Sequence, residues 1–395
     1  MKKIINIIFP FSDFLYLIQL EEYESNRYLR LLPRFFLRRN FQKRGKLVLT
    51  SRAQTTLVTS IGLTAFFIFF LNILSVILIP LWILLANIIL SPLYESLKLN
   101  IQKKASKYFS ENFNGKVIAV AGSFGKTTTK NYIYSLIKFN YKTQMVPGNI
   151  NTPTGIANWV LKNLEKSTEI LIVEMDSYFI GEIARSCAIT PPDIAVLTNI
   201  EDQHLERLGS RENLKKALNE VFDYAKPGAK KIKNKKTSLD NAIEVAKILG
   251  IPKDIVNDTK KRLQKPSRRG DIKNIHGFKT IDHSYNISTK TAIKNLSEAS
   301  ETAKTKKKKL IVITAGIPEL GRENKDGNIN YAKALKKSGT EIVLLKSILH
   351  KNYVNNLDNY KLVGDMNKAW ETIKKEYSPK DYMVLMQPEL GDNYY

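Results

Sequence analysis

The sequence predicts an α/β protein with a mostly parallel sheet domain, a second α/β domain after it, and a transmembrane helical hairpin before them. Three observations predict this architecture. No charged residue occurs between positions 53 and 94, which are mostly apolar. After about Leu97, short apolar runs alternate with helix-like stretches, as in an open parallel sheet covered on both faces. The segment Val117–Thr129 has the pattern of an apolar strand, a glycine turn and a helix start.

The hairpin is predicted at residues 53–94, after a basic N-terminal region at residues 1–52. A spanning helix needs about 20 residues, so the uncharged stretch suits two crossings with a turn near Asn72, Ser75 or Pro80. Basic residues on both sides place both flanks in the cytoplasm under the positive-inside rule. The alternative is a buried hairpin of a soluble protein. The flanking basic residues are Arg27, Arg30, Arg34, Arg38, Arg39, Lys43, Arg44, Lys46 and Arg52 before it, and Lys98, Lys103, Lys104 and Lys107 after it.

The first twenty residues combine two lysines with an apolar run. Asn6, Pro10 and Asp13 interrupt that run, and no small-residue cleavage site follows. This pattern favours an interfacial or helix-packing segment over a signal peptide. If the segment crossed the membrane, the number of crossings would change.

Charge and cysteine content restrict the class of protein. The formal net charge is +25, carried mainly by lysines spread along the chain, with dense runs at 230–236 and 306–309. No aromatic-interleaved basic stripe accompanies them, so we expect a solvated lysine surface and no nucleic-acid partner. The single cysteine, Cys187, excludes an internal disulfide and fits a reducing compartment.

The soluble part is predicted to form two α/β domains, at residues 95–265 and 266–395. The boundary falls at the Pro- and Arg-containing segment that begins at Pro266. Helical patterns lie between most of the strands, for example at Arg211–Tyr224 and Ser238–Leu249. The candidate strands are Val117–Ala121, Glu169–Glu174, Ile194–Asn199, Lys279–Asp282, Lys309–Thr314, Glu341–Leu345 and Tyr382–Met386.

A Gly-x-x-Gly-Lys-Thr turn begins at Gly122 and is the most informative motif of the chain. Between a strand and a helix, such a turn aims backbone N–H groups and a helix N-terminus at one point, which suits phosphate. Lys126 would contact the terminal phosphates, and the Thr127 hydroxyl would bind Mg²⁺. The match to the strict P-loop pattern is incomplete, because the first glycine of that pattern falls on Val120. The alternative is an ordinary glycine-rich turn.

Two candidate metal ligands follow the next strands. Glu174 ends the strand Glu169–Glu174, and His204 comes shortly after the strand Ile194–Asn199. Both would lie at the carboxyl edge of the sheet beside the phosphate turn, where a carboxylate can hold Mg²⁺ directly or through water. A loop histidine taken alone is more often structural. Three further segments are candidates for contacts with the nucleotide or the substrate. They are the polar loop from Pro147 to Gly155 and two segments that each follow a strand of the second α/β unit, residues 282–286 and 316–321.

Taken in order, these motifs resemble the Mur ligase family, and the resemblance covers roughly residues 115–395. Within the family, the chain is most similar to members that add D-alanyl-D-alanine. The chain's final segment, residues 388–394, resembles the end of those members less specifically. The motifs that carry the resemblance are Gly122–Thr127, Gly148–Thr152, Val173-Glu174, Asn199–Glu206, Glu220–Phe222, Asp282–Asn286 and Gly316–Gly321.

The resemblance implies an ATP-dependent amide-bond ligase of peptidoglycan precursor synthesis, with a central ATPase domain and a Rossmann-like C-terminal domain. A muramyl-peptide carboxylate would attack ATP to give an acyl phosphate, and D-alanyl-D-alanine or a similar amine would displace the phosphate. Other cell-wall synthesis proteins are possible partners. The implied catalytic residues are Lys126, Glu174 and His204. The implied metal ligands for Mg²⁺ are Thr127, Glu174 and His204. The implied ATP contacts are Gly122, Ser123, Gly125, Lys126, Thr127, Thr128, Arg268, Asp282 and Asn286. The implied substrate contacts are Asn149, Asn151, Thr152 and Tyr285.

The sequence departs from the family in three places. Leu218 stands four residues before Phe222, where the family usually has a carbamylated lysine that bridges metal ions, and only Lys215 and Lys216 are near. The segment between Phe222 and Ser238 is much shorter than usual. The membrane hairpin replaces the usual uridine-binding domain. These departures leave two alternatives open: a weakened, nucleotide-binding membrane scaffold, or a ligase for another amino-acid substrate.

Overall fold

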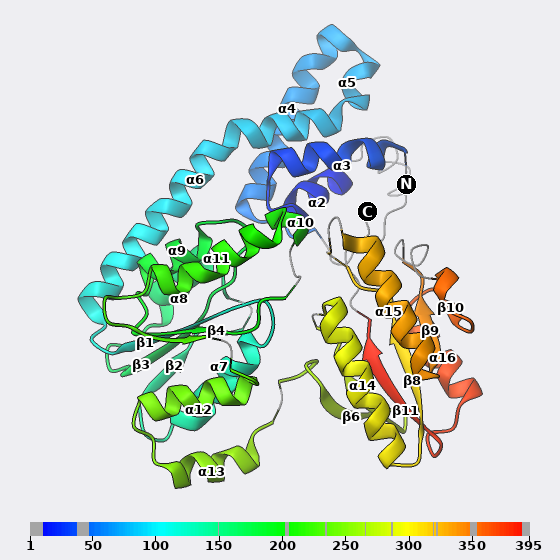
Figure 1. The fold of residues 1–395 in the computed structure, drawn as a ribbon. Coiled ribbons are helices and arrows are strands. Elements are labelled where there is room, and N and C mark those ends of the chain that lie inside the picture. The colour runs from blue at the N-terminus through cyan, green and yellow to red at the C-terminus, as the bar shows by residue number, and fades with distance from the viewer. Residues whose placement is uncertain are drawn as a thin grey trace. The chain divides into compact units, whose positions relative to one another are not determined.

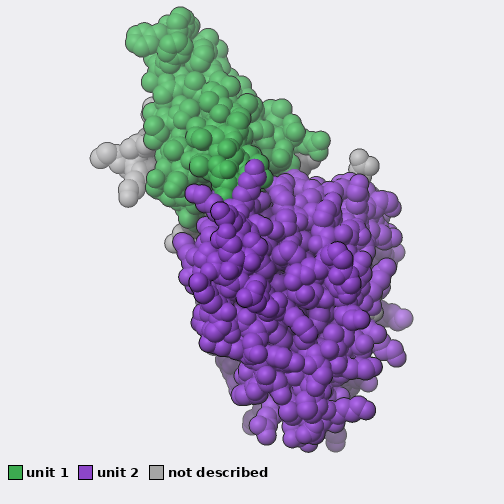
Figure 2. Space-filling model, turned by 90° about the vertical axis from the view of Figure 1, so that its left-hand side faces the viewer, with its two compact units in different colours: residues 1–100, 392–395 green, residues 101–391 purple. Residues whose placement is uncertain are grey.

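The computed structural model describes most of the chain. The described residues are 11–37, 47–148, 150–201, 205–233, 235–264, 266–285, 287–318, 320, 323–347 and 354–388. They divide into two compact units, one within residues 1–100 and the other within residues 101–391 (Figure 2).

The first unit is helical. Two of its helices, α4 and α6, are long and apolar enough to cross a membrane, a test that rests on length and composition alone. The chain breaks at Asn72 and Leu78, so the predicted turn is confirmed. Within the segment predicted to be interfacial or to pack as a helix, Leu15, Leu17 and Ile18 are buried; residues 1–10 lie outside the described part. The helices are α2 (Phe11–Leu20), α3 (Ser25–Leu37), α4 (Ser51–Leu71), α5 (Ile73–Ile77) and α6 (Ile79–Asn112), the last of which continues into the second unit.

The second unit begins with a five-stranded sheet in which all paired strands are parallel, in the order β2-β3-β1-β4-β5. The strands are β1 (Lys116–Ala121), β2 (Thr143–Met145), β3 (Ile170–Glu174), β4 (Ile194–Leu197) and β5 (Lys230–Lys233). The helices are α7 (Lys126–Ile137), α8 (Pro153–Asn163), α9 (Glu182–Ile189), α10 (Leu205–Leu208), α11 (Arg211–Asp223), α12 (Ser238–Ile248) and α13 (Lys253–Arg262).

Helices cover both faces of this sheet, which explains why its central strands are continuous apolar runs. Helices α8, α9 and α11 lie on one face and α7 and α12 on the other (Figure 1). Along β1, Ala119 belongs to the core shared with α8, α9 and α11, whereas Ile118 and Val120 belong to the core shared with α7 and α12. The two cores fix the sheet between layers, so its carboxyl edge and the loops on that edge are held in place.

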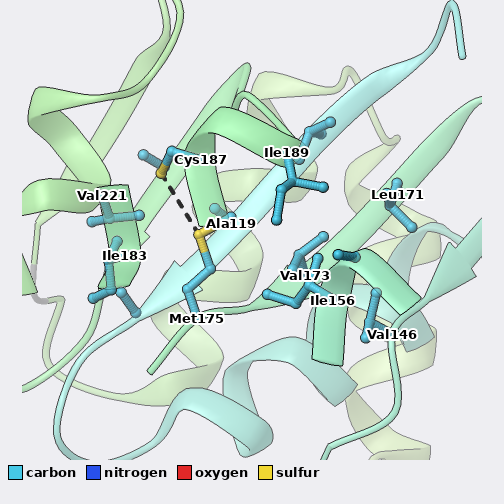
Figure 3. Close-up of a cluster of buried hydrophobic side chains, with 14 of the residues drawn as sticks. Ala119, Val146, Ile156, Leu171, Val173, Met175, Ile183, Cys187, Ile189 and Val221 are labelled. Carbon is cyan, nitrogen blue, oxygen red and sulfur yellow. Dashed lines mark hydrogen bonds between the residues drawn. The ribbon is translucent and has the colours of Figure 1, made fainter. Parts of the chain in front are cut away.

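Cys187 lies in the first of these cores, where its Sγ is 3.7 Å from the Met175 Sδ (Figure 3). Burial raises the pKa of the Cys187 thiol to about 12, so almost no reactive thiolate forms near neutral pH. We expect a maleimide at pH 8 to leave the native protein unlabelled and to label it in denaturant. Rapid labelling without denaturant would contradict this packing.

The second sheet has six strands in the order β10-β9-β8-β11-β7-β6. Its pairs are parallel except β6–β7, an antiparallel hairpin whose turn residues His276 and Gly277 have φ values of 52° and 86°, as a type I′ turn requires. The strands are β6 (Asp271–Ile275), β7 (Phe278–Asp282), β8 (Lys309–Thr314), β9 (Glu341–Leu345), β10 (Lys361–Val363) and β11 (Tyr382–Gln387). The helices are α14 (Thr289–Thr305), α15 (Asn324–Ser338), α16 (Met366–Glu376) and the 3-10 turn η3 (Val354–Asn356).

Helices α14 and α15 pack on one face of the second sheet and α16 on the other. The predicted fold class is therefore confirmed for both α/β parts. Each predicted strand is present, with ends shifted by at most two residues, and the sequence analysis missed β2, β5, β6 and β10.

Candidate phosphate-binding site

The glycine turn after β1 is closely packed against the end of β4. Gly122 and Gly125 have φ values of 135° and 84°, in the region that favours glycine. A Cβ on Gly122 would lie 2.1 Å from the Thr198 Oγ1. That hydroxyl donates to the Phe124 carbonyl at 2.6 Å. The turn is thus held from the neighbouring strand, with no space for a side chain at Gly122.

Lys126 begins α7, and its side chain folds back over the turn. Its Nζ donates to the carbonyls of Gly122 and Ser123 at 2.6 and 3.2 Å and lies 3.1 Å from the Asp176 Oδ2. These contacts hold the buried ammonium group at the helix N-terminus. Ser123 is fixed too, because its N–H donates to the Asn199 carbonyl at 2.8 Å.

The carboxylate of Glu174 lies beside the first turn of α7. The Thr127 hydroxyl donates to the Glu174 Oε2 at 2.8 Å, and the Lys130 Nζ lies 3.3 Å from the same oxygen. The Arg269 Nη2 donates to the Thr127 Oγ1 at 3.0 Å. Glu174 and Lys130 are buried, so the pair is little screened by solvent.

Burial dominates the electrostatics of the two cations near Glu174. It lowers the pKa of Lys130, and the charge of Glu174 opposes this effect. Burial also lowers the pKa of Arg269, again against the attraction of Glu174. For both groups the negative charge of Glu174 thus offsets part of the cost of burial.

The residues present fit a nucleotide phosphate and Mg²⁺. The Thr127 hydroxyl and the Glu174 carboxylate present hard oxygen atoms 2.8 Å apart, which is the donor type that Mg²⁺ prefers. The N-terminus of α7 and the Lys126 ammonium provide donors for phosphate. The third predicted ligand, His204, lies outside the described residues. Within the described ranges, no group of three His, Cys, Asp or Glu side chains suits a metal ion.

The predicted substrate loop contacts this site through Asp176. The Asp176 N–H donates to the Asn151 carbonyl at 3.0 Å, and the Asn151 Nδ2 lies 3.5 Å from the Asp176 Oδ2. Thr152 instead caps α8, since its hydroxyl accepts from the Gly155 N–H at 3.3 Å. Asn149 lies outside the described residues. Of this loop, the structure thus brings Asn151 to the site and gives Thr152 a helix-capping contact.

The predicted nucleotide contacts of the last domain are only partly gathered at the turn. Arg268, at φ 64°, donates to the Oγ and the carbonyl of Ser284 at 3.0 and 2.8 Å. Its neighbour Arg269 reaches Thr127 and places its guanidinium 4.0 Å from the centre of the Tyr285 ring. Asp282 accepts from the Ser284 N–H at 3.0 Å and lies 3.3 Å from the Lys273 Nζ. Asn286 lies outside the described residues.

The sequence analysis missed three charged residues of the site: Asp176, Lys130 and Arg269. Asp176 follows Glu174 by two positions, which is a detectable signal at the end of a strand. Lys130 lies one turn after Lys126 on the same helix, but nothing in the sequence distinguishes it from a surface lysine. Arg269 is adjacent to the predicted Arg268, so the segment was found and the residue within it was not.

Leu218 and Glu220 have structural contacts in α11. Leu218 is buried in the core between α11 and the first sheet, and the nearby Lys215 and Lys216 are exposed. The buried Glu220 carboxylate accepts from the N–H groups of Gly181 and Ala184 at 2.6 and 3.1 Å, which caps the N-terminus of α9. In this structure Leu218 therefore contributes packing, and neither neighbouring lysine is buried in a metal site.

Comparison with known proteins identifies the region that contains the site. Residues 120–299 match the family described as Mur ligase middle domain. The chain contains a Mur ligase middle domain. The predicted family resemblance is therefore confirmed for the stretch that includes the phosphate turn, Glu174 and Arg269.

Sequence relatives of the chain include UDP-N-acetylmuramoyl-tripeptide–D-alanyl-D-alanine ligases. The protein of Bacillus subtilis (strain 168) is 37% identical over 126 residues, which cover 32% of this chain and 27% of the relative. That of Rickettsia prowazekii (strain Madrid E) is 34% identical over 120 residues, 30% of this chain and 26% of the relative. The chain thus spans about a quarter of the length of these curated relatives.

Solved structures of MurF share the fold over a longer stretch. The MurF ligase of Thermotoga maritima in complex with ADP has a TM-score of 0.65 at 22% identity, over 73% of this chain and 80% of that one. MurF from Acinetobacter baumannii has a TM-score of 0.64 at 18% identity, over 74% and 77%. The middle domain and the second sheet therefore have the MurF-like α/β fold.

Proposed function

We propose that this protein is an ATP-dependent amide-bond ligase of peptidoglycan precursor synthesis. It joins D-alanyl-D-alanine, or a similar amine, to the carboxylate of a muramyl peptide through an acyl phosphate. The observation that carries the proposal is the 2.8 Å hydrogen bond from Thr127 to Glu174 beside the N-terminus of α7, within a Mur ligase middle domain. The names of the sequence relatives suggest the substrates.

In this proposal ATP supplies the phosphoryl group. Thr127 and Glu174 would hold Mg²⁺, which would supply positive charge beside the phosphates. Lys126 places a fixed positive charge at the helix N-terminus, where negative charge grows as the phosphoryl group moves. Asp176 keeps Lys126 in position through their 3.1 Å ion pair. Arg269 adds a second cation at Thr127. Because these groups are preorganised, they need not rearrange during the reaction.

For the remaining predicted residues we propose the roles that the family resemblance implies. His204 would hold a second metal ion. Arg268, Asp282 and Asn286 would contact the nucleotide, together with the turn residues Ser123 and Thr128. Asn149, Asn151, Thr152 and Tyr285 would contact the substrate. The position of Asn151, hydrogen-bonded to the partner of Lys126, supports its assignment.

The hairpin would hold the ligase at the cytoplasmic face of the cell membrane. Two features support this proposal: the absence of charge from residue 53 to residue 94, and the exposed apolar side chains where α4 ends and α5 begins, such as Phe69 and Ile73. Such a surface is unfavourable in water. Lipid-linked or nucleotide-linked acceptors would both be accessible from that face.

Phosphate release tests the proposed reaction. The full chain in detergent, with ATP and Mg²⁺, is expected to release phosphate only when a muramyl-peptide acceptor and D-alanyl-D-alanine are both present. A coupled phosphate assay with each component omitted in turn measures this dependence. Phosphate release at the same rate without any amine would contradict the proposal.

A further inference from the structure

We propose that the hairpin of α4, α5 and α6 is re-entrant: it enters the membrane from the cytoplasmic side, turns inside the hydrocarbon and leaves on the same side. This inference rests on the membrane association proposed above. It replaces the two crossings expected from the length of the uncharged stretch. Both topologies leave the flanks in the cytoplasm, and they differ only in where the turn lies.

The turn of the hairpin is apolar. Phe69, Phe70 and Ile73 are 86%, 69% and 73% exposed, and Phe66 and Ile77 are also more than half exposed. A hairpin that crosses twice places its turn in the water or headgroups of the opposite face, where polar residues are expected. An exposed cluster of aromatic and aliphatic side chains at the turn instead suits hydrocarbon.

Several polar groups of the turn are hydrogen-bonded within the hairpin, as hydrocarbon requires of backbone groups. The Asn72 N–H donates to the Ile68 carbonyl at 2.9 Å, and the Ser75 N–H donates to the Asn72 carbonyl at 3.1 Å. The buried Ser75 hydroxyl donates to the Thr64 carbonyl at 2.9 Å. The Trp82 indole N–H donates to the Ser75 carbonyl at 2.9 Å. Side chains thus bind backbone carbonyls at the point where the helices break.

A charged helix lies beside the turn end of α6. The Tyr28 hydroxyl of α3 donates to the Pro80 carbonyl at 3.0 Å. Leu31 and Leu32 of α3 share a core with Ile79. Helix α3 also carries Arg27, and Arg30, which is exposed. If the hairpin crossed the membrane twice, Pro80 would lie near the far face. These arginines would then lie either at that face, against the positive-inside rule, or within the hydrocarbon, where a charge is costly.

The contact with α3 limits how much of the hairpin can enter the bilayer. Phe67 stacks on Trp82 with ring centres 4.5 Å apart, so these residues lie at the same level of the hairpin. The residues between them, 68–81, form two arms of about seven residues, which rise about 10 Å at 1.5 Å per residue. The hydrocarbon core is about 30 Å thick. The turn therefore remains within one leaflet.

Cysteine labelling distinguishes the two topologies. Asn72→Cys would be tested in intact cells and in inverted vesicles with a membrane-impermeant maleimide, because the native Cys187 is buried. We expect no labelling in either sample and full labelling after detergent. Lys98→Cys, after the hairpin, is the matched control and is expected to label only in inverted vesicles. Labelling of Asn72→Cys in intact cells would overturn the re-entrant topology, and labelling in inverted vesicles before detergent would overturn burial of the turn.

Charges at the turn provide a second test. The membrane-bound fraction of the variant Phe69→Asp/Phe70→Asp is expected to be at least tenfold smaller than that of the native chain, because the turn can no longer enter hydrocarbon. Phe139→Asp, at an equally exposed phenylalanine of the second unit, is expected to fractionate like the native chain. Full retention of the double variant would support two crossings and contradict the proposal. If the native chain itself were soluble, the membrane association would fail, which is a separate outcome.

Discussion

Lys126→Ala is expected to lower kcat for ATP-dependent ligation by about a hundredfold to a thousandfold, the effect typical of losing one preorganised charge at a reacting centre. The Lys126 Nζ is held at the helix N-terminus by two carbonyls of the turn and by Asp176. No other lysine of α7 contacts the turn, because Lys130 donates to the Val146 carbonyl instead. Steady-state rates with saturating ATP, acceptor and amine measure the effect.

Lys138→Ala is the matched control for this substitution, since Lys138 is exposed at the other end of the same helix. We expect its rate to stay within about twofold of the native rate, as for a surface change away from the site. If the Lys126→Ala enzyme kept most of its activity, the glycine turn would have no part in the reaction.

Glu174→Gln is expected to lower the free energy of unfolding by about 3 to 5 kcal/mol, because it leaves the buried Lys130 ammonium without its charge partner. The same change removes a proposed metal ligand, so activity should be lost as well. Urea unfolding at pH 7 measures the stability, and the ligation assay measures the activity.

The double variant Lys130→Met/Glu174→Gln separates the two effects. With both charges removed, the buried space holds groups of similar volume, and most of the lost stability should return while activity does not. A double variant as unstable as Glu174→Gln would show that the ion pair does not explain the loss.

The pH dependence of Glu174→Gln has a definite sign. Burial lowers the pKa of Lys130 below its ordinary value of 10.5, and Glu174 opposes that shift; its removal lowers the pKa further. Between the folded pKa and 10.5, the unfolded chain then binds more protons than the folded one. The stability of the variant should therefore rise with pH in that window. Unfolding midpoints at pH 7 and pH 9.5 measure the change, and a fall with pH would contradict it.

The parts of the fold that were predictable from sequence are those with strong periodicity. The strands buried on both faces, such as β1 and β8, are unbroken apolar runs. The missed strands lack this signal. In β5 only Ile232 is buried between exposed lysines, so an edge strand looked like a solvated lysine run. β6 is the polar edge partner of an antiparallel hairpin.

The site was predictable where a motif fixes the backbone. The positions of Gly122, Lys126 and Thr127 in one turn were predictable because the turn needs those residue types, and the position of Glu174 beside it because that residue ends a buried strand. Lys130 could not be found, since its burial depends on a carboxylate from another strand. Arg268 binds Ser284 whereas Arg269 binds Thr127, and no signal in the sequence distinguishes these two adjacent arginines.

The central claim is that this pocket makes an amide bond, and the mass of the acceptor tests it most directly. The full chain would be incubated with ATP, Mg²⁺, a muramyl-peptide acceptor and D-alanyl-D-alanine, and the acceptor analysed by mass spectrometry. We expect the acceptor to gain the mass of the dipeptide less one water, and Lys126→Ala to abolish the gain. Tight ATP binding with no mass gain from D-alanyl-D-alanine or any other amine tested would contradict the ligase assignment.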